Sequence, residues 1–263
     1  MARRCTASIN LNAIKKNYLY AKSLSPNAKA IAIVKANAYG HGAIKVASHL
    51  EDCADCYGVA CTEEAVELRK SGIDKTPILL MEGVFEVSEL KLIEKYNLIV
   101  TVCNSKQLQW LLDNKFNKPV DVFVKYDSGM GRLGFQGEEF INAINLLEES
   151  EKIGQITLMT HFSSADDLNS TSTNEQISNF DKTLYSKKYS TSLANSAGIM
   201  SWSESHREYT RPGIMLYGSS PFPEKNFLNK LTPAMTLSSV LISIKSFKVG
   251  QSIGYGCRYI CKQ

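Results

Sequence analysis

The sequence of 263 residues has no apolar run long enough to cross a membrane. Its N-terminus, Met1 to Leu11, is too short and too polar for the hydrophobic part of a signal peptide, so we expect a cytoplasmic protein. The seven cysteines are an odd number and fit reduced thiols better than a disulfide framework. Cys53 and Cys56 have C-x-x-C spacing, but without a second ligand pair this argues against a metal site.

The sequence also lacks a basic stripe with interleaved aromatic residues, an internal repeat and a low-complexity tract. Its net charge of +4 arises from 30 basic and 26 acidic residues. We therefore expect no nucleic-acid partner, and a small anionic ligand fits better. A chain of this length with 44% hydrophobic residues can bury a large core, and one α/β barrel typically takes about 250 residues.

Short β-like runs recur along the chain and are separated by segments with helical periodicity. The runs are Lys29 to Val34, Tyr57 to Cys61, Pro77 to Met81, Leu98 to Val102, Val120 to Lys125, Ile156 to Thr160, Thr191 to Ala194 and Glu208 to Thr210. This alternation predicts an α/β fold of the (β/α)8 TIM-barrel type, in which active-site groups lie where strands end.

Several of the intervening segments place apolar residues on one helical face. The sets are Leu108, Leu111 and Leu112, then Phe140, Ile144 and Leu147, then Ile177, Phe180 and Leu184. Thr173 and Gln176 have the spacing of a capping box, which predicts a helix N-terminus there. After Gly218 the pattern changes, because Thr236 to Phe247 is rich in Ser, Val, Ile and Leu. We predict a barrel domain over residues 1–230 and the start of a β-rich domain over residues 231–263.

One lysine stands at the end of the first β-like run. Lys35 follows the apolar residues Ala30 to Val34 and precedes Ala36-Asn37-Ala38-Tyr39-Gly40-His41-Gly42, which leads into a helical segment from Ala43 to Leu50. A lysine held at such a strand end can form a Schiff base with a carbonyl group. Taken alone, the same lysine would more often be a surface residue that reaches into solvent.

Further motifs follow the later strands. They are Asp127-Ser128-Gly129-Met130-Gly131-Arg132-Leu133-Gly134-Phe135, Met159-Thr160-His161-Phe162-Ser163, Asn195-Ser196-Ala197-Gly198, Arg211-Pro212-Gly213-Ile214-Met215-Leu216-Tyr217-Gly218 and Gly254-Tyr255-Gly256. The glycines of the first motif allow a backbone shape that holds Arg132 in a fixed turn. Read singly, His161 fits a core residue, Arg211 a surface ion pair and Gly-Tyr-Gly an ordinary turn.

In this order the motifs resemble those of alanine racemases, and the similarity runs from Ile9 to Tyr259. The resemblance implies a pyridoxal 5'-phosphate (PLP) enzyme in which Lys35 forms an aldimine with the cofactor. It also implies that Lys35 and Tyr255 are the two bases that interconvert L-alanine and D-alanine, which supplies D-alanine for peptidoglycan. Tyr255 would come from the second subunit of a head-to-tail homodimer.

The same resemblance assigns roles to other residues. Arg211 would donate to the pyridine nitrogen, which should stay unprotonated because a guanidinium keeps its proton. His161 would stack on the cofactor ring, and Arg132 would contact the substrate and the phenolic oxygen of the cofactor. Lys125 matches a lysine that is carbamylated in some members to orient that arginine. The phosphate group would be bound by Tyr39, Ser196, Gly213 and Ile214.

Family members continue through a full C-terminal β domain, whereas this sequence ends at Gln263. We therefore expect a fragment or truncated gene product with weakened PLP affinity and activity, and a homodimer only if that domain were complete. One alternative is a non-catalytic PLP-binding barrel that acts in cofactor homeostasis. Another is a PLP decarboxylase, which shares Val34-Lys35-Ala36-Asn37 but usually presents glutamate, not an arginine such as Arg211, to the pyridine nitrogen. Serine or a broader range of amino acids is a further alternative to alanine.

Overall fold

The computed structural model describes residues 4–183, 189–222 and 230–262. The chain forms two compact units, one of Ile9–Met235 and one of Met1–Ser8 with Thr236–Gln263. The sequence placed the boundary between a barrel domain and a β-rich domain at residues 230 and 231, and that domain boundary stays a prediction.

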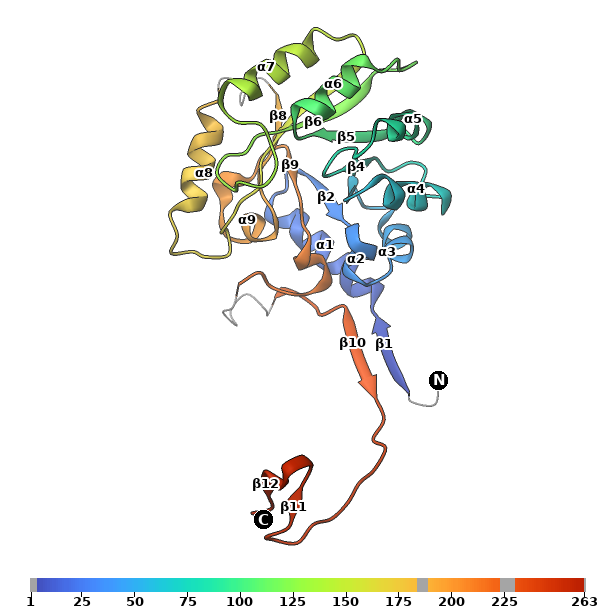
Figure 1. Cartoon of the computed structure of the whole chain (residues 1–263), viewed down its shortest axis with the longest axis vertical. Coiled ribbons are helices and arrows are strands. Elements are labelled where there is room, and N and C mark those ends of the chain that lie inside the picture. Colours follow the sequence, from blue (N-terminus) through green and yellow to red (C-terminus); the bar gives the residue numbers. More distant parts are fainter. Residues whose placement is uncertain (1–3, 184–188, 223–229, 263) are drawn as a thin grey trace. The chain divides into compact units, whose positions relative to one another are not determined.

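The larger unit contains a closed barrel of parallel strands, each paired with the next, and β9 pairs with β2 to close the ring (Figure 1). The strands are β2 (Lys29–Ile33), β3 (Cys56–Val59), β4 (Ile78–Leu80), β5 (Leu98–Val102), β6 (Val120–Lys125), β7 (Ile153–Met159), β8 (Ser190–Ser192) and β9 (Tyr209–Thr210). The predicted (β/α)8 barrel is confirmed, and every β-like run of the sequence contains a barrel strand or part of one.

Helices lie around the strands and connect them (Figure 1). They are α1 (Leu11–Leu24), α2 (Lys35–Tyr39), α3 (Ala43–Leu50), α4 (Thr62–Lys70), α5 (Leu90–Lys95), α6 (Ser105–Asp113), α7 (Gly137–Glu148), α8 (Ser172–Asp181) and α9 (Ser196–Ser201), with short 3-10 turns η1 (Val87–Glu89), η2 (Ser203–Ser205) and η3 (Ile214–Tyr217). The predicted apolar faces pack inward, since Phe140, Ile144 and Leu147 of α7 are buried. Leu184, which we placed on the face of α8, lies outside the described residues.

The core has two layers because neighbouring residues of a strand point to opposite faces. In β2, Ala30 and Ala32 belong to the large cluster beneath the helices, whereas Ile31 and Ile33 belong to a smaller cluster with Leu79, Phe123 and Met159. This alternation assigns the smaller cluster to the barrel interior. Strands buried on both sides explain the nearly continuous apolar runs of the sequence.

The predicted capping box at Thr173 is wrong. The N-cap of α8 is Thr171, which makes no side-chain cap bond, and the helix begins at Ser172. Thr173 is buried in the helix, and its hydroxyl has no hydrogen-bond partner within the described part of the chain. Gln176 does not reach back to the helix N-terminus, and its side chain bonds to the loops after two barrel strands.

The smaller unit contains two short sheets. Strand β1 (Cys5–Ile9) pairs with β10 (Met235–Ser239), and β11 (Ser252–Ile253) pairs antiparallel with β12 (Tyr259–Ile260). A 3-10 turn, η5 (Tyr255–Cys257), lies between β11 and β12. The apolar run from Thr236 to Phe247 is therefore strand only as far as Ser239.

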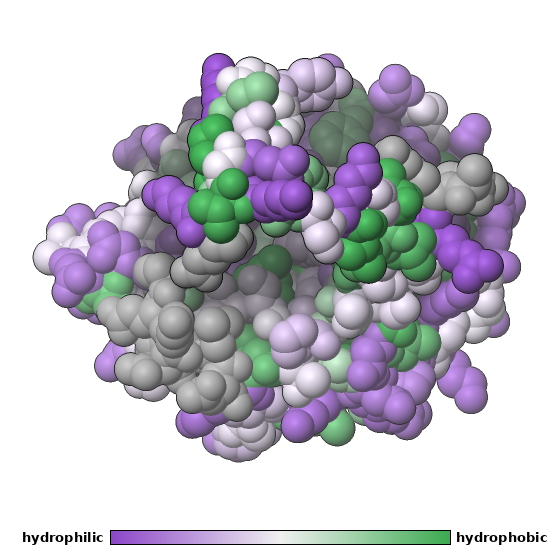
Figure 2. All heavy atoms as spheres, turned by 90° about the horizontal axis from the view of Figure 1, so that it is seen from below, coloured by the Kyte–Doolittle hydropathy of each residue, from purple (hydrophilic) through white to green (hydrophobic). Residues whose placement is uncertain are grey.

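None of the helices that the structure describes has the length and apolar character needed to span a membrane. All seven cysteines fall within the described residues and are free thiols, with Cys56 buried and Cys53 partly exposed. Figure 2 shows one face, with strongly hydrophilic residues mainly around its edge and several groups of hydrophobic residues nearer its centre.

Candidate active site

A pocket of 460 Å³ is formed by segments that follow the barrel strands. Such a volume suits a small organic ligand or cofactor, and active sites of this fold lie at that end of the barrel. The predicted site residues of the larger unit all line the pocket. They are Lys35, Tyr39, Lys125, Arg132, His161, Ser196, Arg211, Gly213 and Ile214. Tyr255 belongs to the smaller unit, where its side chain is fully exposed.

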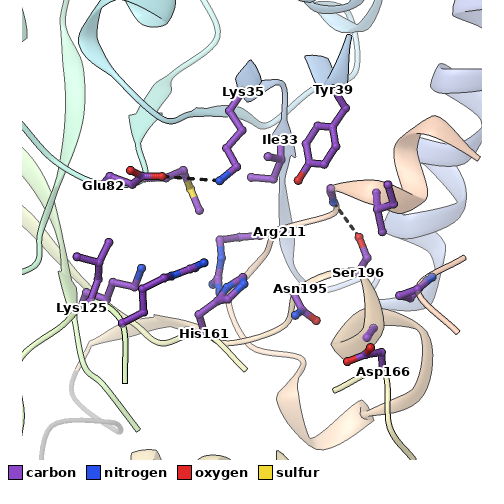
Figure 3. A pocket seen from close by; sticks show the side chains of 17 residues that line it. Ile33, Lys35, Tyr39, Glu82, Lys125, His161, Asp166, Asn195, Ser196 and Arg211 are labelled. Atoms are coloured by element: carbon purple, nitrogen blue, oxygen red, sulfur yellow. Dashed lines mark hydrogen bonds and ion pairs between the residues drawn. The ribbon is translucent and has the colours of Figure 1, made fainter. Parts of the chain in front are cut away.

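Lys35 follows β2 after the buried residue Val34, and its side chain reaches into the pocket (Figure 3). Its amine lies 3.7 Å from Oε1 of Glu82, which follows β4. Both side chains are about one-third exposed, at 33% and 34%, so solvent weakens this ion pair. The pair nevertheless orients the amine toward the centre of the pocket.

The backbone after Lys35 makes a left-handed turn. Ala36, Asn37, Ala38 and Tyr39 have φ angles of 51°, 53°, 54° and 53°. This conformation costs each L-residue roughly 1–2 kcal/mol, and such strain gathers at functional sites. Neighbours hold the turn: the Ala36 N–H donates to Glu64 Oε1 (2.6 Å), and Asn37 Oδ1 accepts from the Ala43 N–H (2.8 Å). The turn brings the Tyr39 hydroxyl into the same pocket as the Lys35 amine (Figure 3).

Arg211 follows β9 and is buried. Its Nη1 donates to Ser192 O (2.8 Å) and Ser192 Oγ (2.5 Å), and its Nη2 donates to Thr160 O (2.5 Å) and Leu193 O (3.1 Å). Burial lowers the pKa of the guanidinium to about 9, which leaves it charged at neutral pH. Its buried Nε–H has no acceptor among the described residues. One fixed, charged donor is thus left for a ligand acceptor.

His161 lies beside Arg211, with its Nδ1 3.3 Å from Arg211 Nη2 (Figure 3). Burial holds the pKa of His161 well below its ordinary value of 6.5, and the charges of Arg211, Lys125, Arg132 and Lys35 lower it further. The imidazole is therefore neutral at physiological pH. Because Arg211 donates to Nδ1, the proton of the ring is assigned to Nε2.

Lys125 ends β6 and is buried, 6% exposed. Burial lowers the pKa of its amine to about 8; nearby Arg211 and Arg132 lower it further, whereas Cys103 and Glu82 oppose the shift. About a tenth of this amine is then unprotonated at pH 7, and the unprotonated amine is the form that reacts with carbon dioxide.

The turn that carries Arg132 is built around the Asp127 carboxylate. Its Oδ1 accepts from the N–H groups of Gly129 (3.1 Å), Met130 (2.9 Å) and Gly131 (3.0 Å). Desolvation would raise the pKa of Asp127, but these backbone bonds and one from the Gln136 side chain hold it below its ordinary value. Gly134 has a φ of 124°, and a Cβ there would lie 2.7 Å from the Asp127 nitrogen, so glycine is required. The predicted fixed turn is thus present.

Ser196, Gly213 and Tyr39 form a polar cradle at another side of the pocket. Ser196 Oγ accepts from the N–H of Gly213 (2.9 Å), which leaves its own proton to donate. A Cβ added at Gly213 would lie 3.1 Å from the Tyr39 hydroxyl. Asn195 caps α9, because its Oδ1 accepts from the N–H of Gly198 (2.9 Å). Closely spaced hydroxyls beside a glycine turn are suited to bind an anionic group.

Sequence reasoning missed the acidic residues of the pocket, Glu82 and Asp166. Glu82 follows Met81 at the end of the third barrel strand, so its position at a strand end was the available signal. Asp166 lies further along the polar segment after β7, and nothing in the sequence there indicated that it would reach the pocket. Within the described residues, no group of three or more His, Cys, Asp or Glu side chains is arranged to hold a metal ion.

Comparison with known proteins identifies the family. A family described as "Alanine racemase, N-terminal domain" matches residues 9–221. The chain is 42% identical over 260 residues to the alanine racemase of Pseudomonas syringae pv. syringae (strain B728a), covering 98% of this chain and 72% of that protein. The chain belongs to the alanine racemase family. Its (β/α)8 barrel is the fold of alanine racemases.

Other alanine racemases give the same picture. The catabolic alanine racemase of Pseudomonas putida is 42% identical over 259 residues, which cover 98% of this chain and 72% of that protein. The crystal structure of the biosynthetic alanine racemase from Pseudomonas aeruginosa superposes with a TM-score of 0.92 at 39% identity, over 99% of this chain and 73% of that one.

The alanine racemase family uses PLP, and the residues of this pocket fit that group. PLP carries an aldehyde, a ring nitrogen that accepts a hydrogen bond, and a phosphate. The pocket offers the Lys35 amine, the Nε–H of buried Arg211, which no described residue accepts, and the cradle of Ser196 and Tyr39.

Proposed function

We propose that this chain is a PLP-dependent alanine racemase that interconverts L-alanine and D-alanine and supplies D-alanine for peptidoglycan. One observation carries the proposal: a single pocket holds the Lys35 amine, the Ser196 cradle and the Nε–H of Arg211, which has no acceptor among the residues that the structure describes. Membership of the alanine racemase family supports the choice of reaction and of alanine as substrate.

The binding roles follow from the chemistry of each side chain. PLP, when bound, withdraws electrons from the α-carbon of the amino acid and so makes its α-proton acidic. Lys35 would hold the cofactor covalently, and Arg211 would donate from Nε to its ring nitrogen. Ser196 and Tyr39, with the backbone of Gly213 and Ile214, would hold the phosphate. Neutral His161 would lie against the ring. Because Arg211 keeps its proton, its Nε–H would donate a hydrogen bond to the ring nitrogen without protonating it.

Racemisation requires one base to take the α-proton from one face and an acid to return a proton on the other face. We assign the D-enantiomer's proton to Lys35 and the L-enantiomer's proton to Tyr255. Full exposure of Tyr255 supports a role in which its hydroxyl meets the pocket of a second subunit.

Arg132 would contact the substrate and the phenolic oxygen of the cofactor. Its presentation on the Asp127 turn supports this role, since a guanidinium on a rigid turn binds oxygen anions without a large entropic cost. Lys125, whose pKa burial lowers to about 8, would orient Arg132 after carbamylation.

A racemisation assay tests the proposal. The purified 263-residue chain is incubated with PLP and L-alanine, and the D-alanine formed is measured by chiral chromatography. We expect D-alanine from the unmodified chain, and none above the no-enzyme rate from Lys35→Ala. Cofactor binding without turnover would instead favour a non-catalytic PLP-binding barrel. Assays with L-serine and other amino acids define the substrate range.

A further inference from the structure

Gln176 is a buried side chain whose hydrogen bonds all leave its own helix, α8. It is 2% exposed. Its Oε1 accepts from the N–H of Ser163 (2.9 Å) and from the Ser163 hydroxyl (3.1 Å). Its Nε2 donates to Ser128 Oγ (3.2 Å) and to the carbonyl of His161 (3.0 Å). A single amide thus connects α8 with the loops that follow β6 and β7.

One end of this connection leads to Arg132. Ser128 is 4% exposed, and its Oγ also lies 2.7 Å from Thr160 Oγ1. Ser128 stands in the turn around Asp127 that presents Arg132. Gln176 also packs against this turn, since a Cβ on Gly129 would lie 3.3 Å from Gln176 Cγ. The Gln176 side chain therefore holds the turn against α8 through one hydrogen bond and one packing contact.

The other end leads to His161 and Arg211. Gln176 holds the His161 carbonyl, and the His161 ring contacts Arg211 through Nδ1. The carbonyl of Thr160, which precedes His161, accepts from Arg211 Nη2. Networks of buried and fully bonded polar groups restrain their members to one arrangement. The position of Arg132 is thereby tied to that of the histidine.

We propose that Gln176 is a positioning residue that couples the turn carrying Arg132 to His161. Gln176 is absent from the residues that line the pocket, so it acts through these two neighbours. The functional consequence rests on the proposed racemase activity, in which Arg132 meets the substrate and His161 the cofactor. The coupling itself is a property of the chain alone.

The substitution Gln176→Glu tests the coupling with almost no change of shape. It keeps the oxygen that accepts from Ser163 and removes the N–H donors to Ser128 and His161. Asn17→Asp is the matched control, because Asn17 is also a buried amide and its Nδ2 donates to Leu216 O (3.0 Å) and Thr232 O (2.8 Å). Thermal melting of both variants measures the general cost of losing two such bonds.

Hydrogen–deuterium exchange of the cofactor-free chain gives the first readout. In Gln176→Glu, segments 127–135 and 160–164 should exchange about tenfold faster than in the unmodified chain, the change expected from loss of one or two buried hydrogen bonds. In Asn17→Asp these segments should exchange at the unmodified rate. Unchanged exchange in Gln176→Glu, or an equal increase in both variants, would overturn the coupling.

The PLP-loaded chain gives the second readout. We expect kcat/KM for L-alanine to fall about tenfold in Gln176→Glu and not in Asn17→Asp. Because Gln176 acts partly through Arg132, the combined loss in Arg132→Lys with Gln176→Glu should be smaller than the sum of the two single losses. Fully additive losses would contradict positioning through Arg132. If the unmodified chain does not racemise alanine, the proposed function fails, and the exchange result still decides the coupling.

Discussion

Arg211 is held by the protein through both of its η nitrogens, and its Nε–H, which has no acceptor in the described part of the chain, can serve a ligand. A lysine at this position would keep the charge but could not reproduce the planar set of donors. The carbonyls of Thr160 and Leu193 would then lose this donor inside a buried site, whereas the carbonyl of Ser192 would keep the Thr160 N–H (3.1 Å). Such a loss is far more costly than the loss of a surface ion pair.

We therefore predict that Arg211→Lys lowers the free energy of unfolding by about 2–4 kcal/mol. The control is Arg207→Lys, since Arg207 forms an ion pair with Asp181 in which the side chains are 31% and 45% exposed. That control should cost less than about 1 kcal/mol. Urea unfolding measures both, and equal losses would show that the buried arginine is not specially bound.

His161 gives the pocket a defined pH dependence. Its pKa in the folded chain lies well below 6.5, chiefly because it is buried. As the pH falls below about 6.5, the imidazole of the unfolded chain binds a proton, whereas the buried imidazole of the folded chain does not. The free energy of unfolding must therefore decrease as the pH is lowered. Between about pH 7 and about pH 5.5 the loss should be roughly 1.3 kcal/mol.

Urea unfolding at both pH values tests this loss in the unmodified chain and in His161→Gln. The variant should show a smaller fall in stability, by roughly 1.3 kcal/mol. His49→Gln, on helix α3 outside the pocket, controls for the removal of an imidazole. The prediction fails if the unmodified chain and His161→Gln lose the same stability on acidification.

At the scale of elements, the ends of the barrel strands could be predicted from the sequence. Most residues of the candidate site lie at or just after these ends. The β-like runs Lys29 to Val34, Val120 to Lys125 and Glu208 to Thr210 placed Lys35, Lys125 and Arg211 at or just after the carboxyl ends of β2, β6 and β9. In a closed parallel barrel these ends meet at one rim, so the residues gather in one pocket. The order of the motifs along the chain therefore predicted that these side chains share one pocket.

The left-handed turn after Lys35 could not be predicted. The run Ala-Asn-Ala-Tyr at residues 36–39 does not indicate a left-handed turn, and one of the contacts that hold it comes from Glu64, which is distant in the sequence. Gln176 was misread for a related reason, because spacing alone suggested a cap. Its true partners, Ser128, His161 and Ser163, are set by the meeting of β6, β7 and α8.

The strain in this turn leads to a prediction for Ala36, which is exposed and has a φ of 51°. Glycine adopts this conformation without steric cost, so Ala36→Gly should stabilise the chain by up to about 1 kcal/mol. The same substitution inside right-handed α3, Ala47→Gly, should destabilise it by about 2 kcal/mol, because it adds a helix-interior glycine and also removes a buried methyl group. Thermal unfolding compares them, and a loss of stability in Ala36→Gly would argue against strain.

At the scale of the whole molecule, the proposed bases lie in different units, Lys35 in Ile9–Met235 and Tyr255 in the smaller unit. The homodimer and the cytoplasmic location implied by the sequence stay predictions. The division of labour between the bases leads to a test of its own. Tyr255→Phe keeps the ring but removes the hydroxyl that exchanges a proton.

We predict that Tyr255→Phe loses racemisation in both directions, since each direction needs both bases. It should still exchange the α-proton of D-alanine with D2O, because Lys35 handles that proton. NMR of the α-proton of each enantiomer measures the exchange. Exchange from L-alanine alone would reverse the assignment of the bases.

Covalent attachment of the cofactor to Lys35 is the central claim, and the pocket offers a competing amine in Lys125. Borohydride reduction of the PLP-loaded chain followed by peptide mass spectrometry locates the attachment directly. The account predicts the mass of the reduced cofactor on the peptide that contains Lys35. Attachment at Lys125, or no attachment at either lysine, would contradict it.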